Sequence, residues 1–172
     1  MMPSLMVMGV SGTGKSSVAT ALAAELHLGF VEGDDHHPRA NIEKMSAGIP
    51  LDDDDRRPWL EELAGVLAAA ATANRPVVLT CSALKRAYRD QLRRGAPDLV
   101  FVHLSGTREV LLPRMAGRER HFMPTELLDS QLATLEPLGP DERGVVVDVA
   151  PPLREVVSAA LDGIRQETGR SG

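Results

Sequence analysis

Short apolar segments alternate along the chain with longer segments in which apolar and polar residues mix. The apolar segments are bounded by glycine or polar residues, which is typical of buried strands. We predict strands at residues 4–8, 30–31, 77–81, 99–104 and 145–149. The mixed segments carry apolar residues three and four positions apart, which is typical of amphipathic helices. We predict helices at residues 16–28, 38–46, 58–74, 83–94, 107–117, 125–135 and 152–167.

Strands that alternate with helices predict a parallel sheet covered on both faces, and therefore one α/β domain over residues 1–172. Pro58 is expected in the first turn of its helix. The acidic segment before it, residues 51–57, lacks the spacing of a calcium-binding loop and is interpreted as a solvated loop. Residues 118–124 form a charged break between two helices, which we interpret as a mobile lid.

Composition and charge narrow the class of protein. The 172 residues are 43% hydrophobic and 25% charged, as expected of a globular domain. The formal net charge of −5 argues against non-specific binding to nucleic acid or to anionic membranes. A single cysteine, Cys81, excludes an intrachain disulfide and leaves no cluster for structural zinc. The apolar start is too short for a signal sequence or a membrane span, so we expect a cytoplasmic protein.

The segment GVSGTGKS matches the phosphate-binding pattern GxxxxGK[ST], and it lies between a predicted strand and a predicted helix. Glycines let successive backbone N–H groups face phosphates at a helix N-terminus. Lys15 is expected to reach the β- and γ-phosphates, and the Ser16 hydroxyl is expected to bind Mg²⁺. The residues expected to bind nucleotide are Gly9, Ser11, Gly12, Thr13, Gly14, Lys15, Ser16 and Ser17.

The other motifs of the chain and its length indicate which class of nucleotide-binding protein it is. The chain has no NKxD segment to read guanine, which argues against a GTPase. A motor ATPase needs a longer chain. A small-molecule kinase fits the length, provided that an acceptor site and a lid are present.

Asp34 is the leading candidate on the acceptor side. It follows the second predicted strand, at the carboxyl edge where open α/β sheets bind ligands. Its carboxylate is suited to accept the proton of an attacking hydroxyl, or to hold Mg²⁺ through water. A turn or a helix cap is the alternative role.

Further along, His37, Asn41 and Lys44 share one predicted helix face, which is either a ligand face or a solvated stripe.

A second group of candidates follows the third strand. Ser82, Lys85 and Arg89 are spaced to share one face of the predicted helix 83–94. A cationic face with a hydroxyl suits a carboxylate or a polyol, whereas a solvated basic face is the alternative.

Arginines around the lid could neutralise charge on the transferred phosphoryl group. These lid candidates are Arg114, Arg118, Arg120 and His121.

Taken together, the motifs resemble those of the gluconokinase family. They are MGVSGTGKS, EGDDHHPRANIEKMSAGIPLDDDDRRPWL, CSALKRAYRD, RERHFMP and SQLATLEPL. The resemblance implies transfer of the γ-phosphoryl group of ATP to the 6-hydroxyl of D-gluconate, with Mg²⁺, to give 6-phosphogluconate. It also implies a nucleoside-monophosphate-kinase-like fold with strand order 2-3-1-4-5, a closing lid and a homodimer.

The same resemblance suggests roles for individual residues. Lys15 and Ser16 hold phosphate and Mg²⁺, Asp34 meets the reacting hydroxyl, Arg118 matches a lid arginine, and Arg114 approaches the adenine. The acceptor-side residues are His37, Arg56, Ser82, Lys85, Arg89, His121 and Gln131. Asp35 places a second carboxylate beside Asp34, so the identity of the base stays open. The alternatives are a kinase for shikimate or another sugar acid, and a nucleotide-dependent switch protein.

Overall fold

The computed structural model describes residues 2–116 and 124–169. Five parallel strands form one sheet in the order β2-β3-β1-β4-β5. The strands are β1 (Leu5–Met8), β2 (Gly29–Val31), β3 (Val77–Thr80), β4 (Val100–Ser105) and β5 (Gly144–Asp148). The helices are α1 (Lys15–Leu26), η1 (Gly33–His36), α2 (Arg39–Ser46), α3 (Asp53–Thr72), α4 (Arg86–Arg93), α5 (Arg108–Ala116), α6 (Pro124–Thr134) and α7 (Leu153–Gly169). The predicted fold class and strand order are confirmed.

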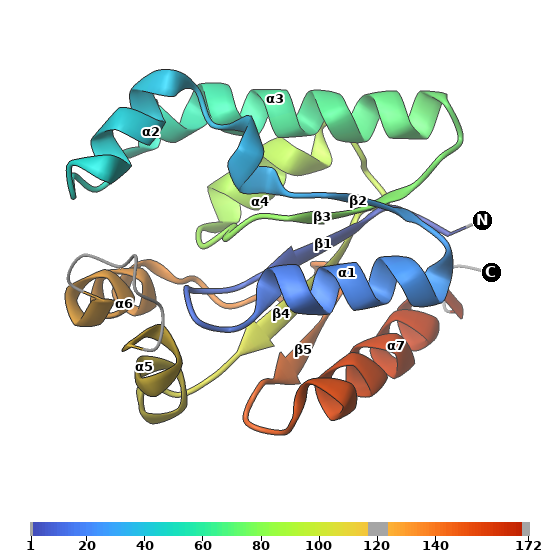
Figure 1. Cartoon of the computed structure of the whole chain (residues 1–172). Coiled ribbons are helices and arrows are strands. Elements are labelled where there is room, and N and C mark those ends of the chain that lie inside the picture. The colour runs from blue at the N-terminus through green and yellow to red at the C-terminus, as the bar shows by residue number, and fades with distance from the viewer. Residues whose placement is uncertain (1, 117–123, 170–172) are drawn as a thin grey trace.

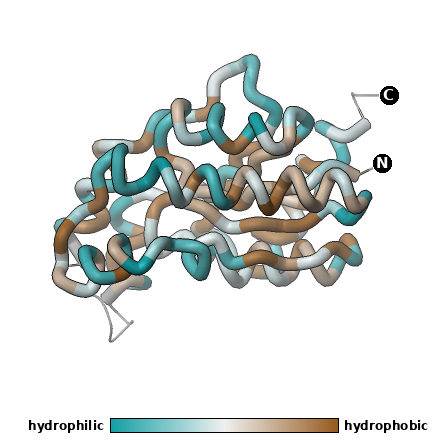
Figure 2. The backbone as a smooth tube through the Cα atoms, turned by 90° about the horizontal axis from the view of Figure 1, so that it is seen from above, coloured by the Kyte–Doolittle hydropathy of each residue, from teal (hydrophilic) through white to brown (hydrophobic). Residues whose placement is uncertain are grey.

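Helices cover both faces of the sheet (Figure 1). Alternate side chains of the buried strands point to opposite faces. On β1, Met6 and Met8 pack with α3 and α4, whereas Leu5 and Val7 pack with α1 and α7. The central part of the sheet is therefore mainly hydrophobic, with polar residues such as Thr80, His103 and Asp148 in or at the ends of its strands, while polar and apolar residues mix along the helices around it (Figure 2). Among the described residues, no helix is long and apolar enough to cross a membrane.

Helix α3 begins earlier than predicted, at Asp53, so the interpretation of the segment as a loop holds for residues 51–52 and was wrong for residues 53–57. The Asp52 carboxylate accepts a hydrogen bond from the Asp55 N–H at 2.7 Å, and the Asp55 carboxylate accepts one from the Asp52 N–H at 3.0 Å. This reciprocal cap, with further aspartates in the positively polarised first turn, stabilises the helix start. Pro58 consequently lies inside the helix rather than in its first turn.

Helix α4 begins later than predicted, at Arg86. Ser82 and Lys85 therefore lie on the loop before it, and the prediction that they share a helix face with Arg89 was wrong. The loop is turned at Ala83, whose φ of 46° is left-handed. Glu136, from the segment after α6, caps the helix from outside by accepting from the Arg86 N–H at 3.0 Å.

Candidate functional site

The phosphate loop joins β1 to α1 through glycines that no other residue can replace without strain. Gly9 has a φ of 146°, and a Cβ there would lie 2.6 Å from the Leu104 carbonyl oxygen. Gly14, with a φ of 83°, immediately precedes α1 and has no side chain with which to cap it. The N–H groups of the first turn are therefore left to an anion, which is how helix N-termini bind phosphate.

Lys15 lies over this loop. Its ammonium group donates to the Gly9 carbonyl at 2.9 Å and to the Val10 carbonyl at 3.2 Å. Thr13 closes the same turn, since its hydroxyl donates to the Val10 carbonyl at 2.8 Å. The positive charge of Lys15 is thus held at the loop whose backbone N–H groups can bind phosphate.

Glu32 is a residue that the sequence analysis did not consider. It directly follows β2, and its carboxylate accepts from the Ser16 hydroxyl at 2.6 Å and from the Thr80 hydroxyl at 2.5 Å. Its position at the end of a strand beside the phosphate loop is the signal that could have identified it. Hydroxyl and carboxylate oxygens are the ligands that Mg²⁺ prefers, so Ser16 and Glu32 fit a magnesium ion held mainly by phosphates and water.

Asp34 lies on η1 with its side chain 77% exposed, and His37 lies behind it with a side chain only 5% exposed. The His37 ring stacks on Trp59 at 4.0 Å. Because the Asn41 amide group donates to His37 Nδ1 at 3.2 Å, we assign the ring proton to Nε2, which faces Asp34 at 3.8 Å. Burial lowers the pKa of His37, although the Asp34 carboxylate opposes that shift. A neutral His37 therefore faces the Asp34 carboxylate at a distance longer than a hydrogen bond.

The stripe formed by His37, Asn41 and Lys44 is a packing surface between α2 and α3. Asn41 donates to the Asp55 carbonyl at 2.9 Å, and the Lys44 ammonium group lies 2.8 Å from the Asp55 carboxylate. This contact with the start of α3 contradicts the alternative of a merely solvated stripe, whereas the acceptor-side role of His37 stays a prediction.

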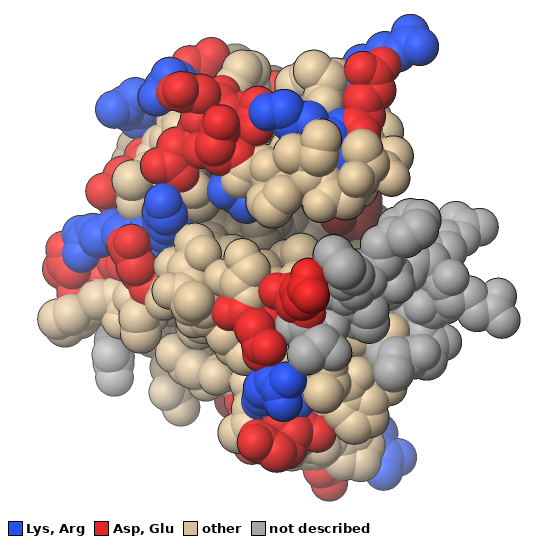
Figure 3. Space-filling view, turned by 90° about the vertical axis from the view of Figure 1, so that its left-hand side faces the viewer, with Lys and Arg blue, Asp and Glu red and all other residues tan. Residues whose placement is uncertain are grey.

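A polar cleft of about 640 Å³ opens between the start of α3, Lys85 and the end of α6. Figure 3 faces this side of the molecule, where acidic and basic side chains are interleaved above a hollow. Arg56 donates to the Leu51 carbonyl at 2.8 Å and to the Tyr88 hydroxyl at 3.2 Å. The residues lining the cleft include Leu51, Asp53, Arg56, Arg57, Lys85 and Thr134.

Arg89 does not reach this cleft. Its side chain is fully buried, and it forms an ion pair with Glu142 at 2.8 Å. It also donates to the Ala83 carbonyl at 2.9 Å. A charge that is buried and paired in this way holds α4 against the segment 137–142. The structure therefore corrects the prediction that Arg89 lies with Lys85 among the acceptor-binding groups.

Gln131, which the resemblance places on the acceptor side, contacts the phosphate loop. It lies on α6, and its side-chain oxygen accepts from the Ser11 N–H of the phosphate loop at 2.6 Å. Thr134, one helical turn further, lines the polar cleft. Because residues three apart share a helix face, α6 connects the phosphate loop to the cleft.

Cys81 directly follows β3 and is buried. Burial raises the pKa of its thiol to about 12. The negative charge of Asp34 raises this pKa further, whereas the positive charges of Lys15 and Arg56 lower it. The thiol is therefore protonated at neutral pH, which leaves it without the thiolate that a nucleophile or a metal ligand needs.

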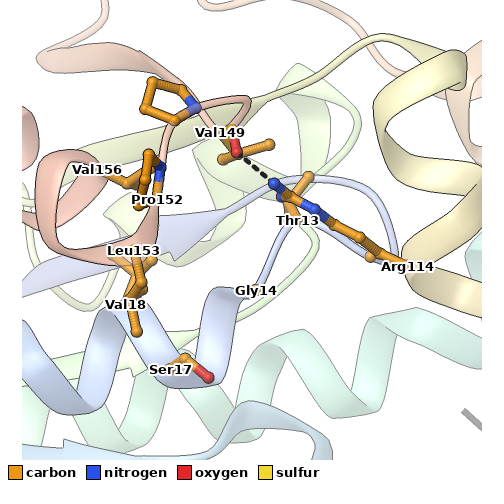
Figure 4. A pocket seen from close by; sticks show the side chains of 11 residues that line it. Thr13, Gly14, Ser17, Val18, Arg114, Val149, Pro152, Leu153 and Val156 are labelled. Carbon is orange, nitrogen blue, oxygen red and sulfur yellow. Dashed lines mark hydrogen bonds between the residues drawn. The ribbon is translucent and has the colours of Figure 1, made fainter. Parts of the chain in front are cut away.

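A second pocket, of about 300 Å³, lies on the other side of the phosphate loop. Arg114 crosses it from α5 and donates to the Val149 carbonyl at 2.8 Å (Figure 4). Gly12, Thr13, Gly14 and Ser17 form the loop side of this pocket, and Pro152, Leu153 and Val156 form an apolar side. A flat, mainly apolar group attached to a phosphate chain fits this arrangement. The lid candidates Arg118, Arg120 and His121 lie outside the described residues.

Comparison with known proteins agrees with this architecture. A family model described as an AAA domain matches residues 5–138. The thermoresistant gluconokinase of Escherichia coli (strain K12) is 47% identical over 161 residues, which cover 93% of this chain and 92% of that protein. The gluconokinase of Gluconobacter oxydans (strain 621H) is 55% identical over 138 residues, covering 80% and 78%. The crystal structure of a gluconokinase from Sinorhizobium meliloti 1021 matches with a TM-score of 0.90 and 52% identity, covering 98% of this chain and 94% of that one. The chain therefore belongs to the gluconokinase family of P-loop kinases.

Proposed function

We propose that this enzyme transfers the γ-phosphoryl group of ATP to the 6-hydroxyl of D-gluconate, with Mg²⁺, giving 6-phosphogluconate. The observation that carries the proposal is the position of the polar cleft, which Lys85 and Arg56 line, one short loop away from the phosphate loop. Two cations suited to an acid thus lie near the loop suited to phosphate, and Asp34 follows β2 at the same carboxyl edge of the sheet. The names of the relatives support gluconate as the acid.

The distance between the phosphate loop and the acceptor cleft suits an extended six-carbon acid. The Gly9 N–H donates to the Ser82 carbonyl at 3.3 Å, so the loop 82–85 starts at the phosphate loop. It ends at Lys85 in the cleft. Three residues span at most about 10 Å. A gluconate whose carboxylate lies at Lys85 and Arg56 thus extends its far hydroxyl toward the phosphates.

In this proposal the transfer depends on positioning and charge neutralisation. The acceptor oxygen attacks the γ-phosphorus, the bond from that phosphorus to the leaving ADP oxygen breaks, and the hydroxyl proton passes to Asp34. His37 faces Asp34 from the protein side, and Lys15 neutralises charge on the phosphates. Ser16 and Glu32 would hold Mg²⁺, which when bound offsets negative charge on the β- and γ-phosphates.

Gln131 is proposed to hold the phosphate loop in place, because its side-chain oxygen accepts a hydrogen bond from the Ser11 N–H. Arg114 and the apolar side of its pocket are proposed to receive the adenine. Whether two copies associate remains a prediction from the family resemblance, and sedimentation velocity of the purified chain tests it directly.

The experiment that tests the function is ADP release from Mg-ATP with a panel of acceptors. The panel contains D-gluconate, other aldonic acids, shikimate, glucose and a sample without acceptor. Gluconate-dependent turnover is expected, and release confined to shikimate or another acid would move the specificity while keeping the chemistry. Release that is indifferent to every acceptor would contradict the proposal and favour an ATPase or a switch protein.

A further inference from the structure

Three aspartates line the cleft, Asp52, Asp53 and Asp54, and the proposed reaction gives none of them a role; Asp53 is the one that contacts Lys85. We propose that Asp53 determines acceptor specificity by accepting a hydrogen bond from the hydroxyl group next to the acceptor's carboxylate. The inference rests on the proposed function, because it takes a sugar acid as acceptor with its carboxylate at Lys85.

Asp53 is held by two donors on one of its oxygens. Oδ1 accepts from the Lys85 ammonium group at 3.1 Å and from the Tyr88 hydroxyl. Oδ2 lies further from the same ammonium group, at 3.4 Å. An ionised carboxylate can accept about four hydrogen bonds. With a side chain that is 59% exposed in the cleft, Asp53 can accept a further donor on Oδ2.

The direction of the surrounding hydrogen bonds makes Asp53 an acceptor only. Arg56 donates to the Tyr88 hydroxyl, and that hydroxyl donates in turn to Asp53. The hydrogen bond from Tyr88, followed by that from Lys85, lowers the pKa of Asp53. Burial, followed by the bond to Asp53, raises the pKa of Tyr88. At neutral pH the chain of donors therefore ends on an ionised carboxylate, which a ligand approaches favourably only with a donor.

The position of Lys85 identifies which hydroxyl supplies that donor. The Lys85 ammonium group already contacts the Asp53 carboxylate. An acceptor carboxylate that binds at Lys85 is therefore the second anion at this one cation. Two carboxylates sharing one ammonium group repel each other. A hydroxyl on the carbon next to the bound carboxylate lies beside Asp53 and places a hydrogen between the two anions. The cleft thus favours 2-hydroxy acids over acids that lack this hydroxyl.

The test compares D-gluconate with 2-deoxy-D-gluconate, which differs only at the proposed contact. Loss of a hydrogen bond to a charged group predicts that kcat/KM of the unaltered enzyme is about 10- to 100-fold higher for D-gluconate. Asp53→Ala is expected to abolish most of that preference, chiefly through KM for D-gluconate. Asp53→Asn keeps the size of the side chain and one acceptor oxygen, so it is expected to retain part of the preference.

Asp90→Ala is the matched control. Asp90 is 55% exposed and pairs with Arg93 at 2.7 Å, so its removal makes the same change in charge at a similar exposure on α4. It is expected to leave the preference unchanged. A preference that survives in Asp53→Ala, or that Asp90→Ala abolishes equally, would overturn the inference. If the unaltered enzyme turned over both acids equally well, the role of Asp53 would be overturned but the proposed function would stand. If it turned over neither acid, the proposed function would be overturned as well.

Discussion

Replacing Glu142 by glutamine is expected to destabilise the fold while leaving acceptor binding intact. The Glu142 side chain is buried and accepts from Arg89 Nε at 2.8 Å, from Arg89 Nη2 at 3.1 Å, from the Gly139 N–H at 3.0 Å and from Arg93. Glutamine removes the negative charge and leaves the guanidinium group of Arg89 buried without its counter-ion. Breaking a buried pair from one side costs about 3–5 kcal/mol.

The pH dependence gives a second measure of the same interaction. Burial raises the pKa of Glu142, but the hydrogen bonds from Arg89, Gly139 and Arg93 outweigh it and lower that pKa to about 2. Against the ordinary value of 4.5, this shift corresponds to about 3 kcal/mol of stability. Because the folded-state pKa is the lower one, the stabilisation is complete above pH 4.5 and is lost as the pH falls toward 2.

Urea unfolding at neutral pH, and then at a series of acidic pH values, measures both effects. Asp141→Asn is the control, because Asp141 forms an exposed ion pair with Arg86 in the same segment and its loss is expected to matter far less. KM for gluconate should be unchanged in Glu142→Gln at temperatures where the variant is folded. Unaltered stability of this variant, or a raised KM with unaltered stability, would refute the assignment of Arg89 to packing.

Four further variants test the site. Lys15→Ala should remove most turnover without unfolding the chain, and a normal kcat measured by ADP release would contradict the phosphate-loop assignment. Asp34→Asn should lower kcat by about 10²- to 10⁴-fold with a smaller change in KM, and an effect on KM alone would make Asp34 a binding residue. Glu32→Gln should raise the Mg²⁺ concentration needed for half-maximal rate, and an unshifted Mg²⁺ titration would speak against its proposed role. Arg114→Ala should raise KM for ATP but not for the acceptor, and the reverse pattern would exclude it from the nucleotide pocket.

The strands and the phosphate loop were predictable because their signals are local. A strand such as β1 is apolar at every position, since both faces of the sheet are covered, and the loop pattern includes its own flanking elements. The start of α3 does not follow from the sequence, for a different reason. The aspartates that suggest a solvated loop are the residues that cap the helix, and Pro58 suggests a later start because proline is common in the first turn of a helix.

The contacts of several site residues depend on partners that are distant in the sequence. Arg89 has the spacing of an exposed basic face, but Glu142 lies 53 positions away and draws it into the interior. Gln131 and Ser11 are 120 positions apart, so no local pattern pairs them. Glu32 contacts Ser16 and Thr80, which lie 16 and 48 positions away, so no local pattern marks it either. Such residues become interpretable only when the strand order brings their elements together.

The strand order also determines when the nucleotide site can form during synthesis. β1 is the first strand in the sequence, yet it is central, with Leu5 opposite Val78 on one side and Val100 on the other. Pairings between residues so far apart in the chain close large loops and fold slowly. The phosphate loop therefore leaves the ribosome early but lacks its two flanking strands until β3 and β4 have been made. A nascent chain that stops before β4 carries the complete GVSGTGKS motif without the sheet that shapes it.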